Sequence, residues 1–177
     1  MSRVPLAGFE PALKIRLEEL WGTPPNLYRA LANHPPLVAA WTEFSKMLRY
    51  DTRTPRALRE LVILRGGQLM QSEYEWAQHL AMARRAGVRE AQIRSLADWR
   101  TSGEFDEREK AALELAEAVT QGRVSDEVHA RVCRHFDNHD YVELAAVAAF
   151  YAMVARMLDA MGVPLEDDMR DYQPRLK

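Results

Sequence analysis

The sequence predicts an all-α fold of about eight or nine helices within a single domain. Leu, Ala, Glu, Arg and Met dominate the chain, and these residues favour helices over strands. Alternating strand patterns are nearly absent, and Pro and Gly fall where one helical run stops and the next begins. A chain of 177 residues is long enough to bury a substantial core as one domain.

Residues 1–50 are interpreted as a helical N-terminal extension that packs on the core. Pro11 can open a first helix, which Gly22 can end before two consecutive prolines block its continuation. A short helix is expected over residues 25–33. After a proline-rich break, an amphipathic helix is expected over residues 37–48.

The expected core covers residues 51–164 and begins with its most apolar helix. Thr54 is expected to cap the N-terminus of this helix, with Pro55 at the first helical position. Because apolar residues surround the helix on nearly all sides, we expect it to be central and buried. The helix that follows is predicted to start at Ser72 and to end at Gly87.

The later helices are predicted from their capping residues and their periodicity. Asp140 and Glu143 have the spacing of a capping box, which predicts the start of a long Ala-rich helix through Met161. Residues 165–177 form a polar tail, expected either to reach a neighbouring subunit or to lie loose. The other helices are expected over residues 91–99, 106–121 and 125–135.

The two central helices carry a polar set that indicates acid–base chemistry. Glu75 and His79 are four residues apart, so they share one helix face. A carboxylate one turn from an imidazole can set its tautomer and raise its basicity, and such a histidine can take and return a proton. Antiparallel packing would bring Glu60 of the preceding helix to the same face, where Ser72 and Tyr74 are candidate substrate contacts.

Each of these residues also has a structural interpretation. Ser72 and Glu75 have capping-box spacing, which needs no catalytic role. Glu60 could simply pair with Arg56 one turn earlier on an exposed edge. The apolar girdle of its helix argues against that, because a buried carboxylate needs a partner. His79 could be a satisfied core histidine, and Tyr74 could serve packing alone.

Composition and charge argue against several function classes. A net charge of −2 gives no support for nucleic-acid binding. Cys133 is the one cysteine, so no internal disulfide or CxxC pair exists, which fits a reducing cytoplasm. We see no secretory signal, and no apolar run approaches the roughly 20 residues of a membrane helix. Cys133, His135 and His139 are not expected to converge, so no metal is predicted.

The central stretch resembles the carboxymuconolactone decarboxylase / AhpD-like family. The resembling segments are Arg59-Glu60-Leu61-Val62-Ile63-Leu64, Tyr74-Glu75-Trp76-Ala77-Gln78-His79 and Ala86-Gly87-Val88. Redox members carry a glutamate, a CxYC pair, and a histidine four residues after the second cysteine. Here Glu60, Tyr74 and His79 match that motif, whereas Ser72 and Glu75 stand at the two cysteine positions.

The resemblance implies an AhpD-like helical fold, no cofactor, and a homo-oligomer, since family members form trimers or hexamers. Without the cysteine pair, thiol peroxidase activity is not expected. The cysteine-free branch implies a lyase resembling the lactone decarboxylase of aromatic catabolism, acting on a small carboxylated or lactone substrate. His79 would shuttle the proton with Glu60, and Glu75 would be a second acid–base group or would repel an anionic substrate. Arg56, Arg59 and Arg65 are candidate anion contacts, although helical spacing cannot place all three in one pocket.

Two alternatives remain open at the level of sequence. One is an AhpD-like, peroxidase-related protein that is redox-inactive because it lacks the CxxC pair. The other is a non-catalytic ligand-binding or assembly module in which Glu60, Ser72 and Glu75 serve only as caps and ion-pair partners.

Overall fold

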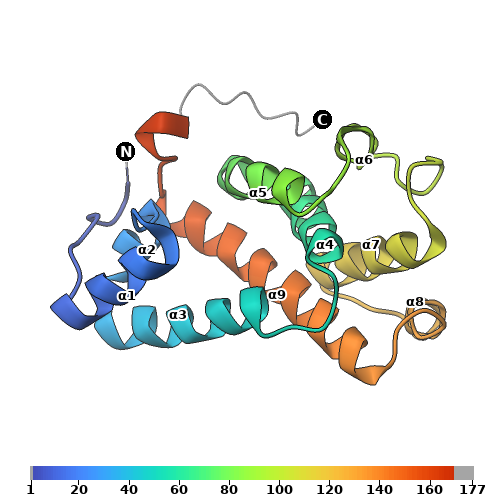
Figure 1. Cartoon of the computed structure of the whole chain (residues 1–177), viewed down its shortest axis with the longest axis horizontal. Coiled ribbons are helices and arrows are strands. Elements are labelled where there is room, and N and C mark those ends of the chain that lie inside the picture. The colour runs from blue at the N-terminus through green and yellow to red at the C-terminus, as the bar shows by residue number, and fades with distance from the viewer. Residues whose placement is uncertain (1, 170–177) are drawn as a thin grey trace. The chain divides into compact units, whose positions relative to one another are not determined.

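The computed structural model describes residues 2–169, and within them the chain is all-α (Figure 1). Nine α-helices and one short 3₁₀-helix follow one another in this range, which confirms the predicted fold class. Two compact units form: residues 2–51 with 156–169, and residues 52–155. That the N-terminal extension packs on the core stays a prediction, and the tail from residue 170 onward lies outside the described residues.

The first unit contains three helices, the end of α9 and the 3₁₀-helix. These are α1 (Pro11–Trp21), α2 (Asn26–Leu31), α3 (Pro35–Tyr50) and η1 (Asp167–Met169). Gly22 ends α1 with a left-handed φ of 69°, as the sequence predicts. Helix α3 begins two residues earlier than expected, because the His34 side chain accepts a hydrogen bond from the backbone N–H of Leu37.

The second unit contains the remaining helices. Helix α4 packs against α5 and against α7, and α7 packs against α8 (Figure 1). Ser125 caps α8 through its side chain, as predicted, and Asp106, expected as the first residue of α7, is its N-cap. The bounds are α4 (Arg56–Leu69), α5 (Glu73–Arg85), α6 (Glu90–Arg94), α7 (Glu107–Thr120), α8 (Asp126–Val132) and α9 (Asn138–Met161).

Helix α4 is the buried centre of the second unit, as its apolar girdle predicts. Leu58 and every residue from Arg59 to Leu64 are buried, including the charged Arg59 and Glu60. The helix continues through both of its glycines. A Cβ on Gly67 would lie 3.4 Å from the Cβ of Glu75, so the missing side chain lets α5 approach closely.

Thr54 does not cap α4, contrary to the sequence prediction. Pro55 occupies the N-cap position, and no side chain caps the helix there. The Thr54 hydroxyl instead bonds the carboxylate of Glu143 on α9, which also accepts the backbone N–H of Thr54 at 2.7 Å. A distant carboxylate therefore holds the segment just before α4, and no side chain caps the helix itself.

The start of α9 also differs from the prediction. The helix begins at Asn138, and Asp137 caps it by accepting the backbone N–H of Asp140 at 3.0 Å. Asp140 and Glu143 are thus not a capping box, because their carboxylates bind Arg53 and Thr54.

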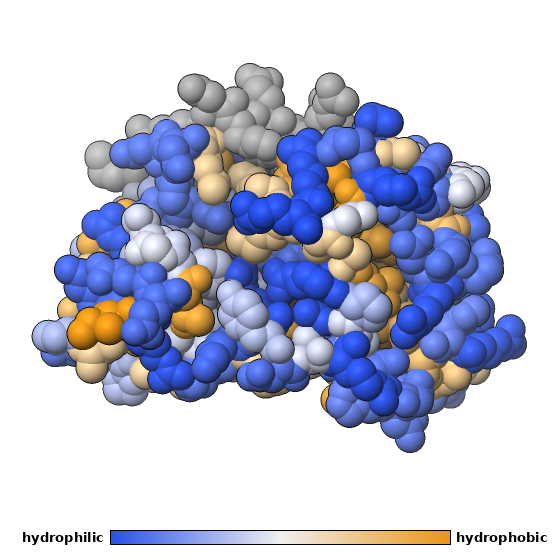
Figure 2. All heavy atoms as spheres, viewed as in Figure 1, coloured by the Kyte–Doolittle hydropathy of each residue, from blue (hydrophilic) through white to orange (hydrophobic). Residues whose placement is uncertain are grey.

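By length and composition, α9 alone among the described helices could cross a membrane, so the prediction that no such run exists was wrong. Half of the apolar window is buried inside the structure, and the core helix of a soluble protein passes the same test. Figure 2 shows mostly hydrophilic side chains on the visible face, with apolar ones scattered between them. This single helix is therefore weak evidence for a membrane span.

Candidate active site

Glu60 and His79 meet inside the second unit. The Nδ1 atom of His79 lies 2.8 Å from Oε2 of Glu60, which is hydrogen-bonding distance. Glu60 is 0% exposed and His79 is 2% exposed. A buried carboxylate without a partner is costly. The packing of α4 on α5 brings these two side chains together, so that each is the partner of the other. The structure thus brings together the two residues that the sequence singled out on neighbouring helices.

The turn between α4 and α5 sets where His79 stands. Gln71 adopts a left-handed φ of 52°, and the N–H of Ser72 bonds back to the carbonyl of Gly67 at 2.9 Å. The hydroxyl of Ser72 then accepts the backbone N–H of Glu75 at 3.4 Å, so Ser72 is the predicted N-cap. Ser72 is half-buried in this capping role.

Glu75 lies on the other side of the imidazole. Its Oε2 is 3.8 Å from Nε2 of His79, and the side chain is 4% exposed. Each ring nitrogen therefore has a carboxylate near it. If Nδ1 donates its proton to Glu60, then Nε2 of the neutral ring carries the lone pair, on the side of Glu75. This geometry suits a histidine that receives and returns a proton at Nε2.

Arg56 connects the buried pair to the surface. Its guanidinium forms an ion pair with Glu60 one helical turn away, as the structural interpretation predicted. The Arg56 side chain is 29% exposed, and it also reaches the sulfur of Met82 on α5 at 3.9 Å. Glu60 is nevertheless wholly buried, so this pairing does not lie on an exposed edge. Arg56 is therefore a partly exposed charge in direct contact with the buried pair.

Tyr151 on α9 completes the surroundings of the imidazole, and the sequence analysis did not select it. Its ring contacts the His79 ring edge to face, with centroids 4.7 Å apart and planes at 84°. Tyr151 lies on the stripe of α9 that also carries the buried Leu144, Val147 and Leu158. A hydroxyl-bearing ring on a buried helical stripe is the signal that could have found it.

Arg65 does not join the pair, although it was a candidate substrate contact. Its Nε donates to Glu117 on α7 at 2.7 Å, and Trp99 donates to the same oxygen at 2.8 Å. Burial raises the pKa of Glu117, but hydrogen bonds from Arg100, Trp99 and Arg65 outweigh this and hold the pKa below its ordinary value. This buried cluster fixes α4 to α7, which leaves Arg65 occupied.

Arg59 lies between the pair and a second polar cluster. It is 4% exposed and donates to the carbonyl of Thr54. Burial and the nearby charge of Arg56 lower its pKa. Glu143, Glu60 and Tyr151 are near enough to Arg59 to act on it electrostatically in the opposite direction. Of the three arginines, Arg56 and Arg59 are therefore near the pair and Arg65 is not.

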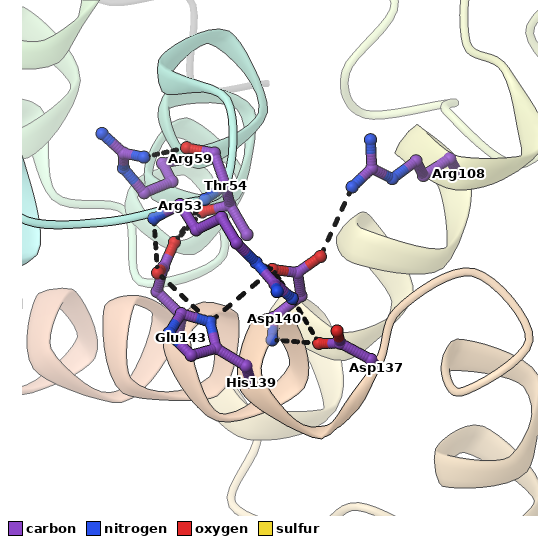
Figure 3. Close-up of polar contacts among 8 residues, drawn as sticks. All are labelled: Arg53, Thr54, Arg59, Arg108, Asp137, His139, Asp140 and Glu143. Atoms are coloured by element: carbon purple, nitrogen blue, oxygen red, sulfur yellow. Dashed lines mark hydrogen bonds and ion pairs between the residues drawn. The ribbon is translucent and has the colours of Figure 1, made fainter.

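The second cluster holds the segment before α4 against the start of α9 (Figure 3). Glu143 accepts the backbone N–H of Arg53 at 2.8 Å, and Nε of Arg53 donates to Asp140 at 2.8 Å. The hydrogen bond from Arg53 lowers the pKa of Asp137 to about 2. Burial raises the pKa of Glu143, but the hydrogen bonds from Thr54 and Arg53 outweigh this and lower it.

The other predicted residues take structural places. Tyr74 is buried in the first turn of α5. Cys133 follows α8, and its sulfur lies 3.4 Å from Nε2 of His129. Among residues 2–169, no three His, Cys, Asp or Glu side chains are grouped in a way that could hold a metal ion.

The region of this chain that matches a known protein family includes this helix pair. The sequence profile of the Carboxymuconolactone decarboxylase family matches residues 35–118. Protein YdfG of Bacillus subtilis (strain 168) is 34% identical over 110 residues, which span 60% of this chain and 75% of YdfG. Protein YnjA of Escherichia coli (strain K12) is 30% identical over 149 residues, which span 82% of this chain and 76% of YnjA.

A solved structure shows the same fold at lower identity. It is the alkylhydroperoxidase AhpD core of an uncharacterized peroxidase-related protein from Ralstonia eutropha JMP134. It superposes with a TM-score of 0.81 at 21% identity, over 94% of this chain and 93% of that one. With the profile match, these relatives and the shared fold, the chain belongs to the carboxymuconolactone decarboxylase family.

Proposed function

We propose that this chain is an acid–base enzyme, a decarboxylase-like lyase that acts on a small carboxylated or lactone substrate. His79 is the proton shuttle, and Glu60 orients its ring. The observation that carries the proposal is the 2.8 Å contact between Nδ1 of His79 and Glu60, both wholly buried. A carboxylate at Nδ1 sets the tautomer of the imidazole and raises its basicity.

The chemistry moves one proton at carbon. In decarboxylation, the bond between the substrate carbon and its carboxylate breaks, and its electron pair passes into the conjugated lactone. Carbon dioxide leaves as that bond breaks. His79, which enters this step protonated, then delivers its proton to the carbon and becomes neutral. Proton transfer by a positioned side chain accelerates such steps by about 10²- to 10⁴-fold. Glu60 stabilises the charged ring before the transfer.

Arg56 and Glu75 have separate parts in this proposal. Arg56 reaches solvent beside the pair, so it is the first cation that an anionic substrate meets. Glu75 stands 3.8 Å from Nε2 and is the second acid–base group. Because Ser72 and Glu75 stand at the cysteine positions of the redox members, peroxide reduction by a thiol pair is not part of the proposal. Assembly into a homo-oligomer stays a prediction, which light scattering of the purified protein checks.

The test uses the full chain and a set of carboxylated unsaturated lactones. Carbon dioxide release and loss of the lactone absorbance are followed for wild type, His79→Gln and His135→Gln. His135 is an exposed histidine of the same unit and serves as the matched control. We expect His79→Gln to lower kcat by about 10²-fold or more, with the control unchanged. Circular dichroism establishes that both variants are folded.

Full turnover by folded His79→Gln would remove histidine from the chemistry. If the wild-type protein turns over no lactone at all, the non-catalytic module becomes the better interpretation.

A further inference from the structure

A carboxylate on α9 holds the segment that leads into α4. Glu143 is 9% exposed, and it accepts the backbone N–H groups of Arg53 at 2.8 Å and of Thr54 at 2.7 Å. It also bonds the Thr54 hydroxyl. Figure 3 shows Asp140, one turn before Glu143, beside the Arg53 side chain, whose Nε donates to it at 2.8 Å. One turn of α9 therefore fixes two residues that lie far earlier in the chain.

The same segment is joined to α4 itself. The guanidinium of Arg59 donates to the carbonyl of Thr54, and the backbone N–H of Arg59 bonds the carbonyl of Pro55 at 3.2 Å. Glu60, which contacts His79, is the next residue of this buried part of α4. Thr54 is therefore held to α9 through its N–H and hydroxyl, and to α4 through its carbonyl.

Helix α9 also supplies an aromatic ring beside the imidazole. Glu143, Val147 and Tyr151 follow one another at intervals of four residues, so they lie on one face of α9, and all three are buried. The Tyr151 ring contacts the His79 ring edge to face, with centroids 4.7 Å apart. Eight residues of an α-helix span about 12 Å, and a close-packed interior transmits a displacement along such a helix. A shift of α9 at Glu143 therefore reaches the contact between Tyr151 and His79.

The imidazole of His79 thus contacts two helices that Glu143 links. Helix α4 places Glu60 at Nδ1, and α9 places Tyr151 against the ring. A local side-chain cap would stabilise the start of α4 without any link to α9. A carboxylate that comes from α9 also determines where α9 stands against the start of α4.

We propose that Glu143 is a positioning residue for His79: its carboxylate sets the position of α9 against the start of α4, and with it the contact between Tyr151 and the imidazole. The inference goes beyond the proposed function, because it concerns how the ring is held and not which substrate the ring serves. Precise placement matters for any such histidine, since a misplacement of about 1 Å caused by a distant substitution can lower a rate by about 10²-fold.

The experiment follows the ring signals of His79 by NMR in the full chain, and it needs no turnover. The signals are assigned by their loss in His79→Gln. Tyr151→Leu removes the neighbouring aromatic ring and shows in which direction the His79 signals move when the contact is lost. Glu143→Gln is then compared with this direction. Thr54→Val removes only the hydroxyl that bonds Glu143, and it decides the matter if Glu143→Gln does not fold.

The matched control is Glu114→Gln. Glu114 on α7 also joins two helices of the second unit, because Arg131 on α8 donates to its two oxygens at 3.0 and 2.7 Å. The control makes the same chemical change in a joint that touches neither α4 nor α9 through these bonds. It therefore separates a displacement of α9 from a general response to the loss of a carboxylate.

We expect the His79 signals of Glu143→Gln to move in the direction set by Tyr151→Leu, and those of Thr54→Val to move the same way by a smaller amount. Glu114→Gln should leave them at their wild-type positions. Signals that stay in place or move in another direction in folded Glu143→Gln, or in Thr54→Val where Glu143→Gln does not fold, overturn the inference, because Glu143 then only stabilises the fold. An equal shift in Glu114→Gln overturns it as well. The proposed function fails on a separate measurement, the turnover of His79→Gln, which leaves these signals of the other variants unaffected.

Discussion

Replacing Glu143 tests whether a distant carboxylate holds the start of α4. In the structure, one of its oxygens accepts the backbone N–H of Arg53 at 2.8 Å. The other accepts the backbone N–H of Thr54 at 2.7 Å and bonds the Thr54 hydroxyl. In Glu143→Gln an amide NH₂ replaces one of these oxygens and faces a donor. Since a hydrogen bond to a charged group contributes about 1.5–3 kcal/mol, we expect the free energy of unfolding to fall by about that amount.

The effect should depend on pH in a definite direction. The pKa of folded Glu143 lies below its ordinary value of 4.5. The unfolded chain therefore binds more protons between the two pKa values, and stability rises with pH across that window. The contribution of Glu143 is complete above the unfolded pKa and is lost as the pH falls through the folded one. The difference between wild type and Glu143→Gln should therefore shrink below about pH 4.5.

The assay is urea unfolding followed by circular dichroism at about pH 7 and about pH 4. Glu107→Gln is the control, because this glutamate is 78% exposed and makes a surface pair with Lys110. A Glu143→Gln variant as stable as wild type near neutral pH would refute the reasoning. So would a difference that stays constant as the pH falls.

Three further predictions concern residues around the helix pair. Glu117→Gln leaves two arginines without their carboxylate, so we expect a loss of about 3–5 kcal/mol and changed Trp99 fluorescence. Its folded pKa is also lowered, so this loss should diminish as the pH falls below the ordinary glutamate range. Gly67→Ala should be neutral or should stabilise the protein by up to ~1 kcal/mol. The larger side chain of Gly67→Leu should push against Glu75, which should lower stability by about 1–3 kcal/mol and reduce turnover. Tyr151→Phe should retain activity because the ring contact survives, and Tyr151→Leu should lower kcat with little change in KM. Equal kcat values for the two Tyr151 variants would contradict a positioning role for its ring.

Sequence alone determined the features that depend on neighbours within one or two helical turns. Ser72 and Ser125 cap their helices as their positions predicted, because a side-chain oxygen needs only the amide three residues on. The apolar girdle of α4 likewise predicted its burial. The contact between Glu60 and His79, 19 residues apart, was expected from the antiparallel packing of two consecutive helices, but only the packing itself supplies it.

Tertiary structure decided the features whose partners lie far along the chain. Thr54, Asp140 and Glu143 each had a plausible local cap to make, yet they bind one another or Arg53 across more than eighty residues. Tyr151 reaches His79 only because α9 folds back over the pair. Local spacing fixes where a helix starts, but which buried charge meets which partner depends on packing and desolvation, and these exist only once the helices have assembled.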